Sequence, residues 1–173
     1  MIIFETSRLI VRQFTTADAK NFFLLNGDIE VVRYIRKPMN KEEADKFLLQ
    51  NIEFYSANPH LGRWLVEEKN TGLFVGSCAL IPLPFEDEKD KLQIGYALLK
   101  SAWGKGYATE LTMAGIDYYF QHHLFDELHA ITSIPNTASQ KVLLKCGFAE
   151  NGTKPEGAEL LQRFIIKRPS HKK

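Results

Sequence analysis

The chain has 173 residues, of which 45% are hydrophobic and 25% charged, and its formal net charge is +1. This composition is typical of one globular domain, and a chain of this length buries enough surface to fold without disulfides. The nearly neutral charge argues against binding nucleic acid, and no apolar run approaches the roughly 18 residues that span a bilayer, so we expect no nucleic-acid or membrane partner and a cytoplasmic location.

The first third of the chain predicts one strand and two helices. Residues 8–14, RLIVRQF, alternate in hydrophobicity as a strand does. A helix should follow over 15–25, and a second over 40–58. Both begin with a capping-box spacing, which pairs Thr15 with Asp18 in the first helix and Asn40 with Glu43 in the second.

The remaining two thirds alternate between strand-like and helix-like segments. Three strands joined by hairpins are predicted over 63–68, 73–83 and 92–99, with further strands over 128–134 and 159–168 and helices over 108–122 and 137–145. The second of these helices should end at Gly147, a residue suited to a left-handed C-terminal position. This order predicts an α+β fold with a mixed sheet flanked by helices.

The segment SAWGKGYATEL, residues 101–111, places two glycines directly before a helix. Unpaired amides and the helix dipole make such an N-terminus a site for phosphate groups. A P-loop is excluded because Gly106 follows Lys105 where Ser or Thr is required. A dinucleotide-binding fingerprint would require a third glycine at position 109, where this chain has Thr109. The structural alternative to a phosphate site is a tight strand-to-helix turn.

Three motifs together resemble the GNAT N-acetyltransferases. WGKGYA is similar to their pyrophosphate loop, with Gly106 and Ala108 matching and Trp103 replacing the first residue of the pattern. IGYALL before it and IPNTASQKVLLKCGF after it resemble the neighbouring strand and helix. TSRLIVRQF and Trp103 are similar to the branch that contains the ribosomal-protein N-terminal acetyltransferases. The resemblance covers residues 6–168 and leaves 169–173 as a short basic tail.

The resemblance implies a single-domain GNAT-like fold in which a splayed pair of strands holds acetyl-CoA. It also implies direct attack by a primary amine in a ternary complex, the acceptor being a peptide or protein N-terminus or a small molecule. The positions that it assigns to acetyl-CoA are Tyr96, Ala97, Leu98, Trp103, Gly104, Lys105, Gly106, Tyr107, Ala108, Thr109 and Asn136. For Asn136 a helix cap is an equally good interpretation.

The catalytic acid and base are less plainly marked. Leu143 stands where many relatives carry a tyrosine acid, and in the ribosomal-protein branch a serine at the Ser139 position is the proposed substitute, so Ser139 is the candidate acid. Gln93 stands where a glutamate is often found, and it cannot accept a proton. The other candidate bases are Glu67, Glu68, Glu86, Asp87 and Glu88, whose alternative is a solvated hairpin surface.

Two cysteines, Cys78 and Cys146, are far apart and have no histidine cluster beside them, so we expect neither a disulfide nor a metal site. Cys146 could suggest a covalent acyl-enzyme, but a packed structural thiol is the better interpretation because no histidine is near it in sequence. The rival to an active enzyme is a catalytically silent acyl-CoA-binding module, which Gln93 and Leu143 favour. The sequence is compatible with a monomer and with a homodimer.

Overall fold

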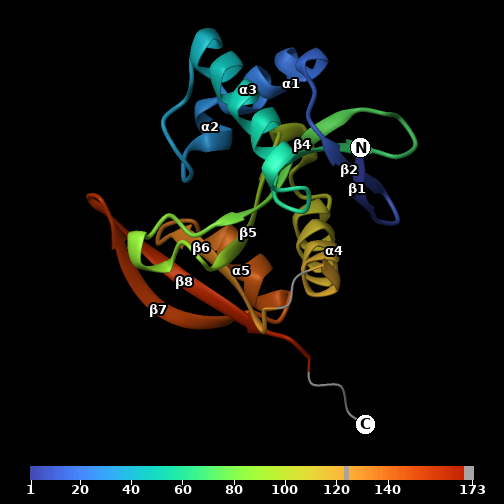
Figure 1. The fold of residues 1–173 in the computed structure, drawn as a ribbon. Helices are drawn as coiled ribbons and strands as arrows, with labels where there is room; N and C mark the ends of the chain where they lie inside the picture. The colour runs from blue at the N-terminus through green and yellow to red at the C-terminus, as the bar shows by residue number, and fades with distance from the viewer. Residues whose placement is uncertain (123–124, 170–173) are drawn as a thin grey trace.

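The computed structural model describes residues 1–122 and 125–169, which form one eight-stranded sheet with helices on both faces (Figure 1). The strands are β1 (Ile2–Glu5), β2 (Leu9–Gln13), β3 (Gly62–Glu68), β4 (Phe74–Pro82), β5 (Leu92–Leu98), β6 (Glu127–Ser133), β7 (Ala149–Glu156) and β8 (Glu159–Lys167). The helices are α1 (Ala19–Asn26), α2 (Ile29–Val32), α3 (Lys41–Ala57), α4 (Tyr107–His122) and α5 (Thr137–Lys145).

The sheet is mixed because one pair of neighbours runs parallel. Its strand order is β1-β2-β3-β4-β5-β6-β8-β7, and β5 and β6 are the parallel pair. Within the described ranges these two strands pair at one position, Gln93 with His129, and beyond it β6 pairs with β8 alone. The predicted α+β fold with a mixed sheet is confirmed, and β5 and β6 separate towards Leu98 and Ser133.

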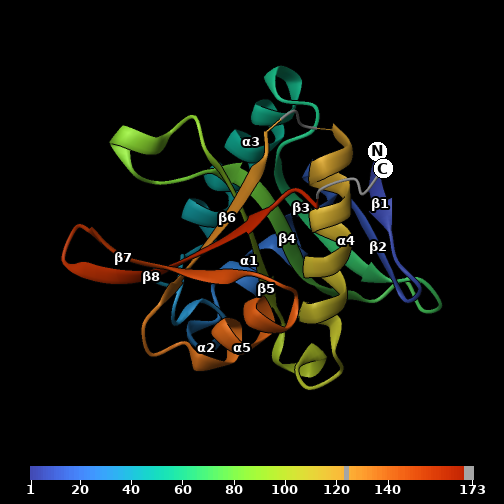
Figure 2. The same cartoon turned by 90° about the horizontal axis from the view of Figure 1, so that it is seen from below.

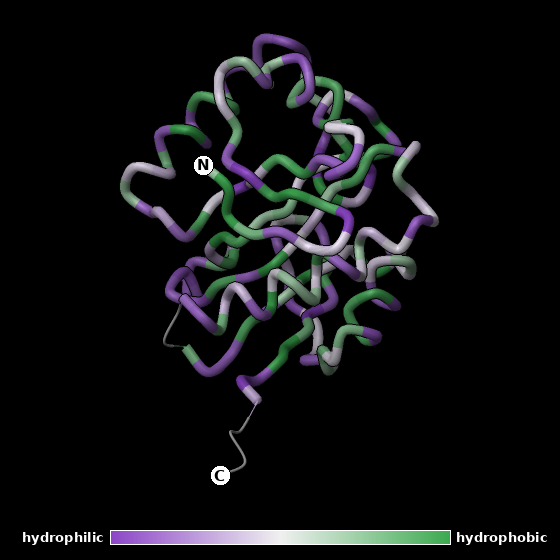
Figure 3. The backbone as a smooth tube through the Cα atoms, turned by 90° about the vertical axis from the view of Figure 1, so that its right-hand side faces the viewer, coloured by the Kyte–Doolittle hydropathy of each residue, from purple (hydrophilic) through white to green (hydrophobic). Residues whose placement is uncertain are grey.

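Alternate side chains of the central strands pack into different cores. On β3, Trp64 and Val66 join the large core beneath α4, whereas Leu65 packs with Phe14 and Leu48 beneath α1 and α3. Figure 2 shows α4 across one face of the sheet with α1 and α3 on the other side. In Figure 3 the colour along the helices changes repeatedly between hydrophobic and hydrophilic, as expected where one side of a helix packs on a sheet.

The capping residues read from the sequence are confirmed at the start of α3. The Glu43 amide donates to Asn40 Oδ1 at 2.9 Å, and the Asn40 amide donates to Glu43 Oε2 at 2.8 Å. The earlier segment differs slightly, because Thr16–Asp18 forms a turn of 3-10 helix and α1 begins at Ala19. Asp18 nevertheless accepts a hydrogen bond from the Thr15 amide at 2.8 Å, as the spacing predicts.

Two strands and one α-helix are absent from the sequence-based prediction. They are β1, α2 and β7, so the six predicted strands are two fewer than the structure has. Strand β7 lies at the edge of the sheet, is almost wholly exposed and contains Gly152 and Pro155, so it has no alternating apolar pattern to reveal it. Within the described part of the chain, no helix has the length and apolar character needed to cross a membrane. Residues 170–173 of the predicted basic tail lie outside the described residues.

Candidate active site

A cleft of about 910 Å³ opens where β5 and β6 separate. Its walls come from β4, β5, β6, α5, the segment around α2 and the loop that precedes α4. The part of its lining on β4 and β5 includes four small residues, Ser77, Ala79, Gly95 and Ala97. The volume is in the range of sites that enclose a small molecule or cofactor.

Nearly all of the predicted site residues line this one cleft. They are Tyr96, Ala97, Leu98, Trp103, Gly104, Gly106, Tyr107, Ala108, Thr109, Asn136 and Ser139. Lys105 differs, because its ammonium lies 3.6 Å from the Glu68 carboxylate. The structure thus brings together segments from three separate motifs of the sequence.

In the glycine loop, residues 103–106, both glycines have a left-handed backbone conformation. Gly104 has φ +73° and Gly106 has φ +81°, values that residues with a side chain adopt at a cost of about 1–2 kcal/mol. A Cβ at Gly104 would meet no atom within 4 Å. The glycines therefore serve the turn itself, and they also leave the backbone accessible from the cleft.

Helix α4 directs its N-terminus at the loop. The Glu110 amide donates to the Gly106 carbonyl at 3.1 Å, which leaves the amides of Tyr107, Ala108 and Thr109 without partners inside the helix. The helix is 16 residues long, so its dipole adds roughly half a positive charge at this end. The cleft therefore contains a site suited to an anionic group such as a phosphate.

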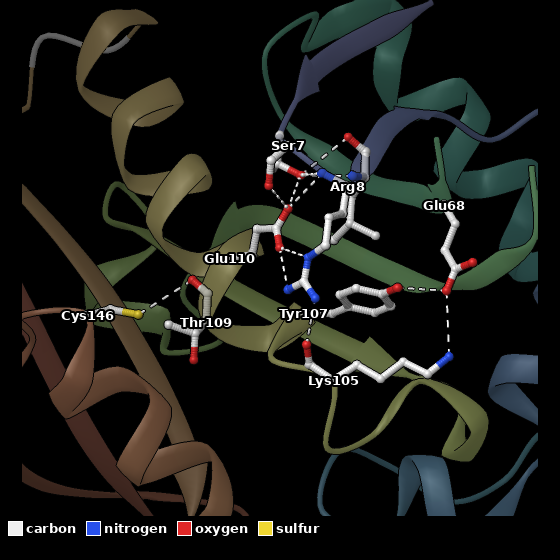
Figure 4. Close-up of polar contacts among 10 residues, drawn as sticks. Ser7, Arg8, Glu68, Lys105, Tyr107, Thr109, Glu110 and Cys146 are labelled. Atoms are coloured by element: carbon white, nitrogen blue, oxygen red, sulfur yellow. Dashed lines mark hydrogen bonds and ion pairs between the residues drawn. The ribbon is translucent and has the colours of Figure 1, made fainter. Parts of the chain in front are cut away.

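Arg8, from the turn between β1 and β2, holds the loop in place (Figure 4). Its Nε and Nη2 lie 2.7 and 2.6 Å from Glu110 Oε2, and its Nη1 donates to the Lys105 carbonyl at 2.9 Å. The guanidinium also lies 4.6 Å from the centre of the Tyr107 ring. The sequence did not mark Arg8 as a site residue, because its partners are about a hundred positions away.

Glu68 braces the other side of the loop. It accepts a hydrogen bond from the Tyr107 hydroxyl at 2.7 Å (Figure 4), and a second one from the Thr71 hydroxyl at 2.9 Å. The Tyr107 bond is the main cause that lowers the pKa of Glu68, and the same contact raises the pKa of Tyr107. Glu68 is therefore ionised and engaged in holding Tyr107.

The other candidate bases also lie outside the cleft lining. Glu67 is 3.2 Å from Arg12, and Glu86 is 2.7 Å from Lys89. Asp87 and Glu88 both pair with Lys154, at 2.7 and 2.9 Å. The carboxylates that do line the cleft are Glu30, Glu156 and Glu159, two of which flank the β7–β8 turn that the sequence did not reveal.

The free edge of β5 faces the separation from β6. The Trp103 indole donates to the Leu98 carbonyl at 2.8 Å, so the backbone groups of Leu98 point away from β4. Because successive residues of a strand direct their backbone groups to opposite edges, Tyr96 also faces the gap and Ala97 faces β4. The gap is therefore edged by backbone groups that a strand-like ligand could pair with.

The side chains of Ser139 and Tyr96 meet beside the gap. The Tyr96 hydroxyl donates to Ser139 Oγ at 3.3 Å, and the Ser139 amide donates to Asn136 Oδ1 at 3.2 Å. Burial raises the pKa of Tyr96, so its hydroxyl stays protonated. Asn136 is the cap of α5, as one of its two interpretations expected, and it also lines the cleft.

Gln93 and Cys146 both have hydrogen-bond partners close by. Gln93 lies where β5 and β6 begin to separate, and its side-chain amide donates to the Pro82 carbonyl at 3.2 Å. The Cys146 thiol lies 3.7 Å from the Thr109 carbonyl (Figure 4), and burial raises its pKa. Cys146 is thus a protonated thiol packed between α4 and α5. Among the residues that the structure describes, no cluster of three metal-ligating side chains occurs.

Comparison with known proteins supports this reading of the cleft. A family model described as the acetyltransferase (GNAT) domain matches residues 8–149. The uncharacterized N-acetyltransferase YoaA of Bacillus subtilis (strain 168) is 29% identical over 152 residues, which cover 87% of this chain and 84% of YoaA.

Two solved structures share the fold. An acetyl transferase from Salmonella typhimurium that modifies the N-terminal serine of ribosomal protein L7/L12 has a TM-score of 0.80 at 16% identity, covering 98% of this chain and 100% of that one. A spermidine N-acetyltransferase from Vibrio cholerae, in complex with CoA and spermine, has a TM-score of 0.76 at 20% identity, covering 93% and 96%.

The sheet, the glycine loop and the cleft define an acetyl-CoA-dependent N-acetyltransferase. The chain belongs to the GNAT acetyltransferase domain family, whose model covers most of its length. The predicted family and fold are therefore confirmed, and the neighbours include the ribosomal-protein branch that the sequence resembles.

Proposed function

We propose that this protein transfers the acetyl group of acetyl-CoA to a primary amine. The acceptor is either the N-terminal α-amine of a peptide or protein, or the amine of a small molecule. The observation that carries the proposal is that one cleft contains both the glycine loop and the open gap between β5 and β6, and extends to the α2 segment. The similar proteins acetylate such amines, a protein N-terminus in one case and spermidine in the other.

The chain's own residues fit acetyl-CoA along the length of the cleft. The amides of residues 104–108 and the Thr109 hydroxyl would hold the pyrophosphate, because the glycines leave them accessible and the α4 dipole favours negative charge. The backbone groups of Tyr96 and Leu98 would pair with the amides of the pantetheine arm as an added strand does. Asn136 would offer its side-chain amide from the opposite wall.

Acetyl-CoA supplies an activated thioester. The acceptor nitrogen attacks its carbonyl carbon directly, a C–N bond forms and the C–S bond breaks. A backbone amide near Leu98 stabilises the charge that develops on the carbonyl oxygen, and positioning both reactants supplies much of the acceleration. Ser139 donates a proton to the departing sulfur, while the hydrogen bond from Tyr96 stabilises the negative charge left on Ser139 Oγ.

The proton on the acceptor nitrogen does not require a dedicated carboxylate. An α-amine with a pKa of about 7.7 to 8.0 is neutral in roughly a tenth of molecules at pH 7, whereas a lysine amine is neutral in about one of two thousand. A water chain can then take the second proton during attack. Gln93 in the place of a glutamate therefore argues for an α-amine or weakly basic amine over a lysine side chain.

A thiol-release assay tests the proposal directly. The protein is incubated with acetyl-CoA and a panel of peptides, small amines and a lysine-containing peptide, and mass spectrometry identifies the acetylated product. We expect release of CoA with acetylation of α-amines before lysine side chains. Tight binding of acetyl-CoA with no acetylated product from any amine would favour a silent acyl-CoA-binding module instead.

A further inference from the structure

Two arginines line the cleft, and both contact one aromatic ring. Arg36 follows α2 and Arg63 lies on β3, and both line the cleft. Their guanidinium carbons are 5.1 and 5.0 Å from the centre of the Phe47 ring on α3. We call these three residues, Arg36, Arg63 and Phe47, the arginine wall.

The arginine wall has no anionic partner of its own. Arg36 donates to the neutral side chain of Asn26 at 2.7 Å, and within the described ranges no carboxylate forms an ion pair with Arg36 or Arg63. In contrast, the half-buried Arg12 and Arg163 pair with Asp18 and Glu88, both at 2.9 Å. Two cations that share a cleft and lack a counterion are destabilised by desolvation and mutual repulsion.

Desolvation acts on both guanidinium groups. It lowers the pKa of Arg36, and together with the charge of Arg36 it lowers the pKa of Arg63 to about 10. Both arginines remain charged at neutral pH. An anion bound between them would relieve the repulsion, and two planar guanidinium groups suit the geometry of a carboxylate.

The arginine wall is in line with the region where acetyl transfer would occur. Arg63 pairs in register with Ala79, which pairs with Gly95 on β5. These positions share one face of the sheet, and the small side chains of Ala79 and Gly95 leave the path open. With strands about 4.8 Å apart, the backbones of Arg63 and Gly95 are roughly 10 Å apart. A side chain and a small acceptor together span that distance.

We propose that Arg36 and Arg63 bind a carboxylate of the acceptor, so that the preferred substrate is an amine that also carries a carboxylate a few bonds from its nitrogen. This inference rests on the proposed acetyl transfer and narrows its substrate class. It separates the protein from an enzyme for polyamines, whose substrates carry only positive charge and would be repelled by the arginine wall.

Matched acceptors test the inference with the unmodified protein. Initial rates are measured with acetyl-CoA for alanine against alaninamide, for Ala-Glu-amide against Ala-Gln-amide, and for spermidine. We expect at least a tenfold higher kcat/KM for the acidic member of one pair. The pair that shows it tells whether the carboxylate is the α-carboxylate or a side chain.

Variants then locate the effect. Arg63→Gln and Arg36→Gln should reduce the ratio of acidic to neutral kcat/KM towards one, mainly through KM, and Arg63→Lys should retain part of it. Arg33→Gln is the matched control, since Arg33 is exposed near the same segment and stacks on Tyr34 at 5.4 Å. It should leave the ratio unchanged.

Two results would overturn the inference. Equal rates within both pairs, or a preference for spermidine, would show with the unmodified protein that the arginine wall does not select a carboxylate. A preference that survives both glutamine substitutions would place the selection elsewhere. Acetylation of no amine at all would instead contradict the proposed function, so the two failures are distinguishable.

Discussion

The glycine loop and the arginine wall face the same cleft but present different chemistry to it. The loop offers backbone amides that are accessible because Gly104 and Gly106 adopt positive φ. The arginine wall offers charged side chains gathered from β3 and from the segment after α2. In the proposed reaction acetyl-CoA is the shared ligand, whereas the acceptors of similar proteins differ, a protein N-terminus in one case and spermidine in another. A backbone site therefore suits the shared ligand, and a side-chain site suits the variable one.

The largest expected effect is on kcat and concerns Ser139, a side chain on the same side of the cleft as the glycine loop. It tests whether that side contributes a catalytic side chain in addition to its backbone amides. Ser139→Ala should lower kcat about a hundredfold, because a positioned proton donor contributes that order of rate, while the Kd for acetyl-CoA changes less than twofold. Steady-state kinetics and calorimetric titration measure the two quantities. Thr137→Ala, an exposed position two residues earlier on α5, is the matched control. Normal turnover in Ser139→Ala would remove this residue from the mechanism.

The next effect concerns the loop itself. Gly106→Val should raise the Kd for acetyl-CoA at least tenfold, since valine strongly disfavours φ +81° and its Cβ would lie 3.5 Å from Arg8 Nη2, so the loop that presents the amides would have to change conformation. Gly72→Val shares the strain, at φ +67°, but lies in the distant β3–β4 turn and should leave the Kd unchanged. If both variants fold and bind acetyl-CoA equally well, the loop is not the phosphate site.

A smaller effect on stability and on the Kd for acetyl-CoA should follow when the contacts of Arg8 with the glycine loop are removed and the loop sequence is kept. Arg8→Gln removes the ion pair with Glu110 and the bond to the Lys105 carbonyl. We expect a loss of about 1–3 kcal/mol in the free energy of unfolding and a several-fold weaker Kd for acetyl-CoA. A double-mutant cycle with Glu110→Gln should show clear coupling in denaturant unfolding. Additive changes would mean that the two side chains act independently.

The smallest expected effect is on the pH dependence of stability, and it concerns Glu88, which contacts the β7–β8 hairpin. Bonds from Lys154 and Lys91 and the charge of Arg163 lower the pKa of Glu88 to about 2 from 4.5, and these contacts tie β7 and β8 to the segment before β5. A lowered pKa stabilises the fold above pH 4.5, and that contribution disappears as the pH falls from 4.5 towards 2. Thermal unfolding across this range should depend less on pH in Glu88→Gln than in the unmodified protein. Identical pH profiles would contradict the assignment.

The residues that line the loop side of the cleft could be found from the sequence because they are close together in it. The glycines, the strand before them and the helix after them lie within a short stretch, and Asn136 and Ser139 share one helical turn. Backbone conformation at a glycine is a property of a few neighbouring residues, so the pattern survives without knowledge of the fold. The same holds for Asn40 and Glu43, whose capping box is confirmed.

The arginine wall could not be predicted because its contacts join distant positions. Arg36, Phe47 and Arg63 come from three elements, and nothing in their spacing marks them as neighbours. Glu159 lines the cleft only because β7, an exposed edge strand without apolar alternation, turns back into β8. The acidic candidates chosen from sequence were exposed-looking hairpin residues, and the structure engages them in ion pairs outside the cleft lining.

One further consequence concerns how the two halves of the sheet are joined. Among the described residues, β5 and β6 share a single paired position, Gln93 with His129, so the halves are linked mainly by side-chain packing in the core beneath α4 and not by backbone pairing. A ligand that pairs along the gap would supply the missing ladder and couple the unfolding of both halves. At a hundredfold excess over its Kd, such a ligand stabilises a fold by about 2.7 kcal/mol. Amide hydrogen exchange should therefore slow on β6 as well as on β5 when acetyl-CoA is added, which makes the co-substrate a structural member of the sheet.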